Sequence, residues 1–100
     1  MKYEWSKRSI GVLKTLHPDL QLIMNLAIQR TSVDIVLVEG ARDISSQRRY
    51  FKDGLSKINP DEYGSEEELC KVAKHITIED HSLYNYSRAV DFCAYAFHNG

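Results

Sequence analysis

The chain has 100 residues, of which 43% are hydrophobic, and its formal net charge is −1. This length suits one small domain near the lower limit for burying a core, so we predict a single domain over residues 1–100. The near-zero charge disfavours nucleic acid and membrane surfaces as partners. Residues 1–5 lack the apolar stretch of a signal peptide, so we expect a cytoplasmic protein.

Two helices are predicted in the first third of the chain. Ser6 or Ser9 can cap a short helix, whose apolar positions are Ile10, Leu13 and Leu16. His17-Pro18 ends this helix, because the residue before a proline avoids helical angles, while Pro18 suits the first turn of a second helix. The stripe of the second helix that we expect in the core comprises Leu20, Ile23 and Ala27.

Two further helices are predicted in the middle of the chain. Asp43 or Ser45 begins the first of them, and Gly54 ends it. Ser65 begins the other, whose first turn carries three glutamates near the positive end of the helix dipole. The apolar face of that last helix is expected to comprise Leu69, Val72 and Ala73.

Two segments have the pattern of β-strands. The run at 34–39 is short and β-branched and ends at Gly40, and residues 89–97 form a second apolar run. The fold class is therefore predicted as α+β, with about four helices and a small antiparallel sheet. Because two strands leave unpaired edges, we expect a helix or another chain to cover an edge, and a homodimer would do so.

The two cysteines match neither a metal-binding nor a redox spacing. We expect Cys70 and Cys93 to be two thiols, with Cys93 in the core, and a disulfide between them is the alternative.

Five fragments occur in one order along the chain and resemble the phage L-alanyl-D-glutamate endolysins, which belong with the D-alanyl-D-alanine carboxypeptidases. The resemblance implies a truncated zinc-peptidase scaffold of phage or prophage origin, located in the host cell cytoplasm. Only residues 59–80 look like an insertion. The fragments are Leu16-His17-Pro18-Asp19-Leu20-Gln21, Val38-Glu39-Gly40-Ala41-Arg42, Gln47, Gly54-Leu55-Ser56-Lys57 and Ser87-Arg88-Ala89-Val90-Asp91-Phe92.

The resemblance implies two residues that bind substrate. An arginine after the first strand binds a substrate carboxylate in this family, and a glutamine on the next helix helps to place the peptide. These roles would fall on Arg42 and Gln47. A guanidinium suits the first role, because its planar fork matches a carboxylate in two hydrogen bonds. The alternative is a surface ion pair between Arg42 and Asp43 or Glu39.

The family's metal motif, S-x-H-x-x-G-x-A-x-D, aligns with residues 82–91. Asp91 matches one zinc ligand, but Tyr84 stands at the position of the histidine ligand and Ser87 at that of the glycine. The family's third ligand and its general-base glutamate belong to its second half. Since catalytic zinc needs about three protein ligands, we expect Asp91 to be vestigial, no catalytic residue and no bound cofactor.

Two alternatives stay open around this motif. His81 and His98 flank Asp91 and could restore zinc as rescue ligands, and His75 is a further candidate. Tyr84 and Tyr86 could form an aromatic surface that binds a partner, or could only pack against the sheet.

These residues favour a non-catalytic binding protein, a pseudoenzyme derived from a peptidase, that engages a host or phage protein. The first alternative is a zinc endopeptidase or carboxypeptidase that cuts peptidoglycan. The second is a peptidoglycan-binding module that retains Arg42 and Gln47 without the chemistry.

Overall fold

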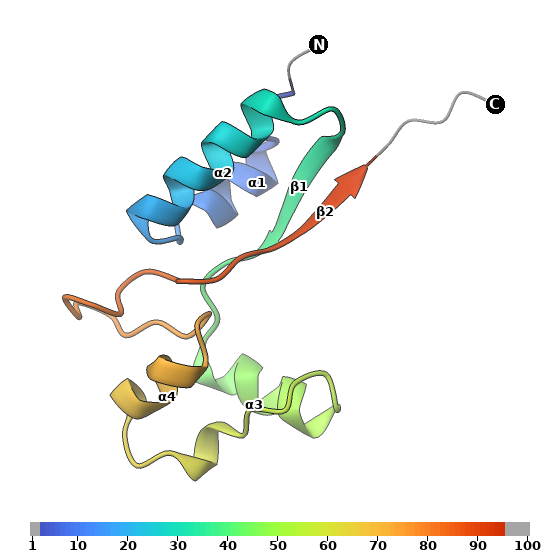
Figure 1. Cartoon of the computed structure of the whole chain (residues 1–100). Helices are drawn as coiled ribbons and strands as arrows, with labels where there is room; N and C mark the ends of the chain where they lie inside the picture. Colours follow the sequence, from blue (N-terminus) through green and yellow to red (C-terminus); the bar gives the residue numbers. More distant parts are fainter. Residues whose placement is uncertain (1–2, 96–100) are drawn as a thin grey trace.

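Four α-helices and a two-stranded antiparallel sheet make up residues 3–95, the part of the chain that this computed structural model describes (Figure 1). The predicted α+β fold is confirmed. None of the helices in this described part has both the length and the apolar composition needed to cross a bilayer. The elements are α1 (Lys7–Leu13), α2 (Pro18–Arg30), β1 (Asp34–Glu39), α3 (Ile44–Lys52), the 3₁₀ turn η1 (Pro60–Glu62), α4 (Glu66–Val72) and β2 (Asp91–Tyr95).

Short polar side chains begin three of the helices. Ser6, Asp43 and Ser65 each accept the backbone N–H three residues later, at 3.1, 2.7 and 3.2 Å. Of the predicted alternatives, the structure therefore uses Ser6 rather than Ser9 and Asp43 rather than Ser45. These bonds satisfy donors that the first helical turn leaves without a partner.

The register of the sheet sets the position of two carboxylates. Leu37 pairs with Phe92, and the next pair is Glu39 with Asp91, because β1 has a bulge between Leu37 and Glu39. A bulge adds a residue to one strand and turns the side chains that follow it. Glu39 and Asp91 therefore lie opposite each other at the end of the sheet.

The second strand begins later than predicted, at Asp91 instead of residue 89. The preceding segment is held against the turn between α1 and α2, where the Ser87 backbone N–H donates to the Thr15 carbonyl at 2.8 Å. The Ser87 hydroxyl also donates to the Ala89 carbonyl at 2.6 Å. These bonds keep the segment out of the sheet. The predicted strand positions 96 and 97 lie outside the described residues.

The first hydrophobic cluster lies between the sheet and α1 and α2. On α2 the buried side chains are Met24 and Ile28, whereas Ile23, expected on the core stripe, is 58% exposed. The expectation for Ile23 was wrong, because α2 presents the face carrying Met24 and Ile28 to the core and Ile23 falls beside it. The cluster comprises Leu13, Leu16, Met24, Ile28, Ile35 and Leu37.

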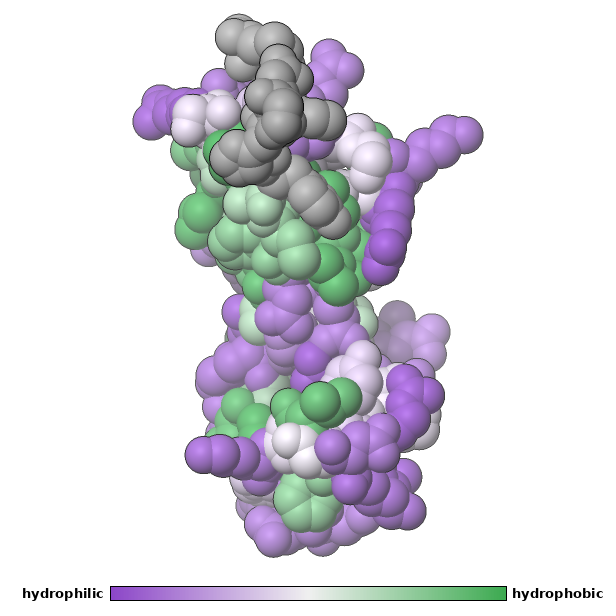
Figure 2. Space-filling model, turned by 90° about the vertical axis from the view of Figure 1, so that its right-hand side faces the viewer, coloured by the Kyte–Doolittle hydropathy of each residue, from purple (hydrophilic) through white to green (hydrophobic). Residues whose placement is uncertain are grey.

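The second hydrophobic cluster lies around α4. Its members are Leu69, Cys70, Ala73, Ile76 and Tyr84, while Val72, expected on the apolar face, is 44% exposed. Figure 2 shows hydrophilic side chains between the two apolar parts of the surface.

The two cysteines are free thiols, and it is Cys70 that is buried while Cys93 is exposed. Cys70 is fully buried, and burial raises the pKa of its thiol. Cys93, expected in the core, is exposed. It pairs with Val36, and alternate residues of a strand point to opposite faces, so Cys93 points away from the face of Ile35 and Leu37 that α1 and α2 cover.

Both sheet edges lack a third strand within residues 3–95. Phe92 on β2 is 54% exposed and Val38 on β1 is 41% exposed. The expected cover by another chain, as in a homodimer, stays a prediction.

Gly40 lies closer to the turn between α1 and α2 than any other residue could. A Cβ atom on it would collide with Thr15 Oγ1 and would lie 2.8 Å from Leu16 Cδ2 and 3.1 Å from the Val12 carbonyl oxygen. Thr15 Oγ1 accepts the Ala41 N–H at 3.0 Å, so it cannot move aside without losing that bond. Close packing therefore requires glycine at the end of β1.

We predict that Gly40→Ala lowers the free energy of unfolding by about 2 kcal/mol, because the added methyl group overpacks this contact. Gly11→Ala is the matched control. Gly11 lies inside α1 and a Cβ there meets nothing within 4 Å, so the change should stabilise the chain by about 0.5–1 kcal/mol. Chemical denaturation measures both, and equal effects would contradict the packing argument.

Candidate functional site

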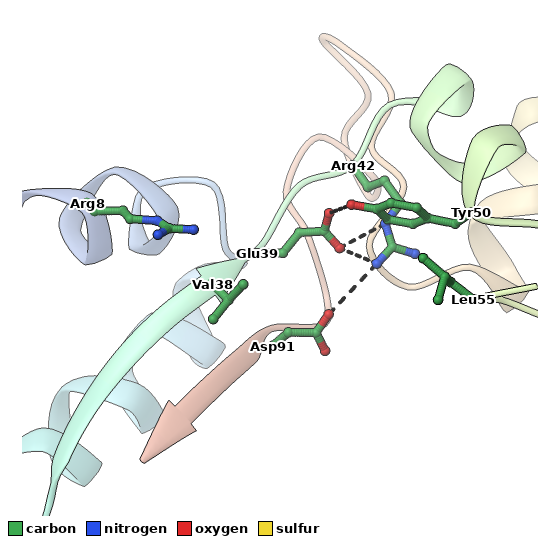
Figure 3. Close-up of a pocket in the computed structure, with 7 residues that line it drawn as sticks. All are labelled: Arg8, Val38, Glu39, Arg42, Tyr50, Leu55 and Asp91. Atoms are coloured by element: carbon green, nitrogen blue, oxygen red, sulfur yellow. Dashed lines mark hydrogen bonds and ion pairs between the residues drawn. The ribbon is translucent and has the colours of Figure 1, made fainter. Parts of the chain in front are cut away.

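Polar side chains from distant parts of the chain converge where β1 ends and β2 begins. Glu39 and Asp91 come from the two strands, Arg42 from the segment after β1, and His75 from the segment after α4. Figure 3 shows the carboxylates of Glu39 and Asp91 both directed at the Arg42 guanidinium. The turn that carries Arg42 is fixed because the Arg42 N–H donates to the His75 carbonyl at 2.8 Å.

Arg42 is anchored on several sides. Its Nε and Nη2 both donate to Glu39 Oε1, the former at 2.9 Å, and its guanidinium stacks over the Tyr50 ring at 4.6 Å. Nη2 also lies 3.8 Å from Asp91 Oδ2. The side chain is only 12% exposed. Of the alternatives for Arg42, the ion pair with Glu39 is therefore present, and the Nη2 edge faces Asp91.

Gln47 lies behind Arg42 and has no exposed surface. Its Oε1 accepts Arg42 Nη1–H at 2.8 Å, while its Nε2 donates to Ser56 Oγ and to the Ile58 carbonyl, both at 2.9 Å. All its strong hydrogen-bonding groups are thus used inside the protein. The structure therefore places Gln47 where it orients Arg42 instead of contacting a peptide.

The Glu39 carboxylate is held in its charged form. Burial raises its pKa, but hydrogen bonds from Arg42 and from the Tyr50 hydroxyl, the latter at 3.0 Å, outweigh burial and bring the pKa below the ordinary value. A carboxylate of lowered pKa is a poor proton acceptor at neutral pH. The position and pKa of Glu39 therefore suit it to holding Arg42.

His75 has one nitrogen fixed and the other directed at Asp91. Nδ1 lies 2.7 Å from the Gly40 carbonyl oxygen, and because a carbonyl can only accept, Nδ1 must carry the proton. Nε2 lies 3.5 Å from Asp91 Oδ2. A histidine that ligates metal ordinarily donates its other N–H to a carbonyl or carboxylate in this way.

His75 and Asp91 are spaced as two of the ligands of a zinc ion would be. Potential ligand atoms of Glu39, His75 and Asp91 all lie within 4.8 Å of one another. Arg42 and Tyr50 occupy both oxygens of Glu39, which leaves His75 and Asp91 as the free ligands. Their 3.5 Å separation resembles the roughly 3.3 Å between two ligands of a tetrahedral zinc with bonds of about 2.0–2.1 Å.

An open cavity of about 400 Å³ adjoins Glu39 and Asp91. Its polar wall contains Glu39, Arg42 and Asp91, and Asp91 is the most accessible of the three, with 60% of its side chain exposed. The other lining residues are Arg8, Val38, Tyr50 and Leu55. The cavity can therefore admit a small peptide beside Asp91.

The tyrosines of the aligned motif lie in different surroundings. Tyr84 is only 9% exposed, packs in the second hydrophobic cluster and stacks on the His81 ring with centroids 5.0 Å apart. The Arg88 guanidinium also lies over the Tyr84 ring, 4.5 Å from its centre. Tyr86 is 37% exposed and lines no part of the cavity described above. The structure thus gives Tyr84 a packing role.

His81 is engaged away from Asp91. Its Nε2 lies 3.2 Å from Glu67 Oε1, and its Nδ1 accepts the N–H groups of Leu83 and Tyr84 at 3.0 and 3.2 Å. With both nitrogens used, His81 is not placed to serve as the expected rescue ligand. His98, the other expected rescue ligand, lies outside the described residues.

The sequence of this chain matches one family over nearly its whole length. The sequence model of the phage L-alanyl-D-glutamate peptidases matches residues 1–99. The chain belongs to this family. Its origin is therefore that of a phage endolysin-like peptidase, as the motifs predicted. No curated protein and no solved structure matches the chain significantly.

The motif alignment missed His75, whose imidazole is the nearest to Asp91 among residues 3–95. The family motif places its histidine seven positions before the aspartate, which selects Tyr84, whereas His75 lies further back in the chain. The intervening residues form an irregular segment, in which the Ile78 N–H donates to the Tyr84 carbonyl at 2.7 Å. A longer loop in the motif would have offered His81 before His75, so spacing alone could not have selected His75.

We predict that Glu39→Gln lowers the free energy of unfolding at pH 7 by about 1–3 kcal/mol, since it removes a half-buried charge partner of Arg42. The Glu39 pKa is lowered by folding, so its contribution is present above the ordinary value of 4.5 and is lost as pH falls through the folded pKa. Between pH 7 and a pH below the folded pKa, the free energy of unfolding should therefore fall less for the variant than for the wild type. Denaturant titrations from pH 7 to pH 3 measure this, and parallel curves would contradict it.

Proposed function

We propose that this chain holds a zinc ion between His75 and Asp91 and binds peptidoglycan stem peptides beside it, as the metal- and substrate-binding part of a peptidoglycan peptidase. The observation that carries the proposal is the pair of contacts made by His75. Its Nδ1–H is fixed on the Gly40 carbonyl at 2.7 Å, and its Nε2 faces Asp91 Oδ2 at 3.5 Å.

Membership of the phage L-alanyl-D-glutamate peptidases supports the choice of metal and substrate. Zinc bound at such a site polarises a peptide carbonyl and lowers the pKa of a water ligand. The scissile bond we propose is that between L-alanine and D-glutamate in the stem peptide.

The remaining residues of the cavity would bind and orient the peptide. Arg42 presents its Nη2 edge next to Asp91, so a substrate carboxylate that takes this edge comes to lie beside the metal ligands. Glu39 and Gln47 act as positioning residues, because they hold the other donors of Arg42. Val38 and Leu55 give the cavity an apolar wall for the alanine methyl group.

The non-catalytic role expected from the sequence rested on Tyr84 at the histidine position and on the third ligand and general-base glutamate that belong to the family's second half. His75 places an imidazole beside Asp91 and so answers the first of these two reasons. A binding module without chemistry remains the second candidate. The state of Glu39 favours this candidate. Its ion pair with Arg42 lowers the pKa of the Glu39 carboxyl, and a carboxylate of lowered pKa is a poor general base for hydrolysis.

Zinc content tests the proposal directly. Protein purified without a histidine tag should bind about one zinc per chain, and His75→Ala and Asp91→Asn should each weaken zinc binding at least about tenfold. His81→Ala is the control, since its ring is held by Glu67, and it should bind zinc as the wild type does.

Elemental analysis and competition with a chelating dye measure these affinities. Loss of zinc in His81→Ala together with retention in His75→Ala would contradict the proposed ligands. Release of soluble peptides from purified cell walls by the zinc-loaded chain separates the peptidase from the binding module, which would bind the walls without cutting them.

A further inference from the structure

The cavity beside Asp91 has a second cationic wall. Arg8 on α1 lines it together with Arg42, although the two are 34 positions apart in the chain. Figure 3 shows the Arg8 side chain extending from α1 toward the side of the cavity that holds Glu39. One cavity therefore carries two guanidinium groups that come from different elements.

The two arginines differ in what already holds them. The Arg42 guanidinium donates to Glu39 and Gln47 and is only 12% exposed. Arg8 is exposed, and its side chain makes no hydrogen bond or ion pair with any residue between positions 3 and 95. Within this part of the chain, nothing occupies the five N–H donors of Arg8.

Neither of the two carboxylates that line the cavity forms an ion pair with Arg8. Glu39 is paired with Arg42, and Asp91 faces Nη2 of Arg42 and Nε2 of His75. Two guanidinium groups and two carboxylates line the cavity, so a divalent cation on Asp91 would give it a positive excess. An anionic group is the complement of such a wall.

We propose that Arg8 is a specificity-determining residue that binds a second carboxylate of the peptide, so that the site selects peptides carrying two carboxylates. This inference rests on the proposed function, because Arg42 is taken to hold the first carboxylate. Val38 and Leu55 add two apolar side chains to the lining of the cavity. A planar guanidinium binds a carboxylate through two parallel hydrogen bonds, which gives direction as well as affinity.

Two dipeptides of nearly equal shape test the inference. L-alanyl-D-glutamate carries two carboxylates, whereas L-alanyl-D-glutamine has an amide in place of one of them. For the wild type in the presence of zinc, isothermal titration calorimetry should show about five- to tenfold tighter binding of the D-glutamate peptide, the size expected for one partly exposed charged hydrogen-bonded pair.

Arg8→Ala should abolish this preference and leave the affinity for L-alanyl-D-glutamine unchanged, and Arg8→Lys should restore part of the preference. Lys7→Ala is the matched control: it removes a neighbouring positive charge on α1 that does not line the cavity, so the preference should persist. Because Arg8 is exposed, its variants should keep the wild-type melting temperature.

The outcomes separate the inference from the proposed function. Equal binding of the two dipeptides by the wild type, or an unchanged preference in Arg8→Ala, would overturn the role of Arg8 and leave peptide binding intact. If Lys7→Ala lost the preference to the same extent as Arg8→Ala, the preference would come from the overall positive charge of α1, and the role of Arg8 would be overturned as well. If neither dipeptide bound, both the inference and the peptide-binding part of the proposed function would fail.

Discussion

The hydrogen bond between His75 Nδ1 and the Gly40 carbonyl oxygen joins the two parts of this small protein, and the candidate site depends on it. Gly40 can offer its carbonyl there because it packs directly on the turn between α1 and α2, where a side chain has no room. The bond fixes the tautomer and the direction of the imidazole together. It therefore connects the packing of the first hydrophobic cluster with the position of a potential metal ligand.

A second constraint separates the carboxylates of the site into two kinds. The β-bulge places Glu39 opposite Asp91, yet their surroundings differ. Glu39 is saturated by Arg42 and by the hydroxyl of Tyr50, whereas the Asp91 side chain is 60% exposed and faces His75. Similar chemical groups at neighbouring positions thus take different roles, because one is enclosed by donors and the other is open to a ligand.

Local signals predicted most of the fold, and long-range contacts account for most of what they missed. Ser65 and Gly54 mark helix ends through a side-chain cap and a positive φ of +73°, and both depend only on near neighbours. The burial of Gln47 was not predictable, because its partners lie in an irregular loop. His75 was missed for the same reason: its contact with Gly40 spans 35 positions, and the fixed spacing of the family motif selected Tyr84 instead.

The most direct measurement records the imidazole nitrogens by long-range ¹⁵N–¹H NMR while zinc is added to the protein. Before zinc, His75 should have its proton on Nδ1, as its bond to the Gly40 carbonyl requires. On addition of zinc, the Nε2 signal of His75 should change to that of a metal-bound nitrogen, while the signals of His17 and His81 stay in place. A His75 proton on Nε2, or a zinc-dependent change confined to the other histidines, would contradict this account of the site.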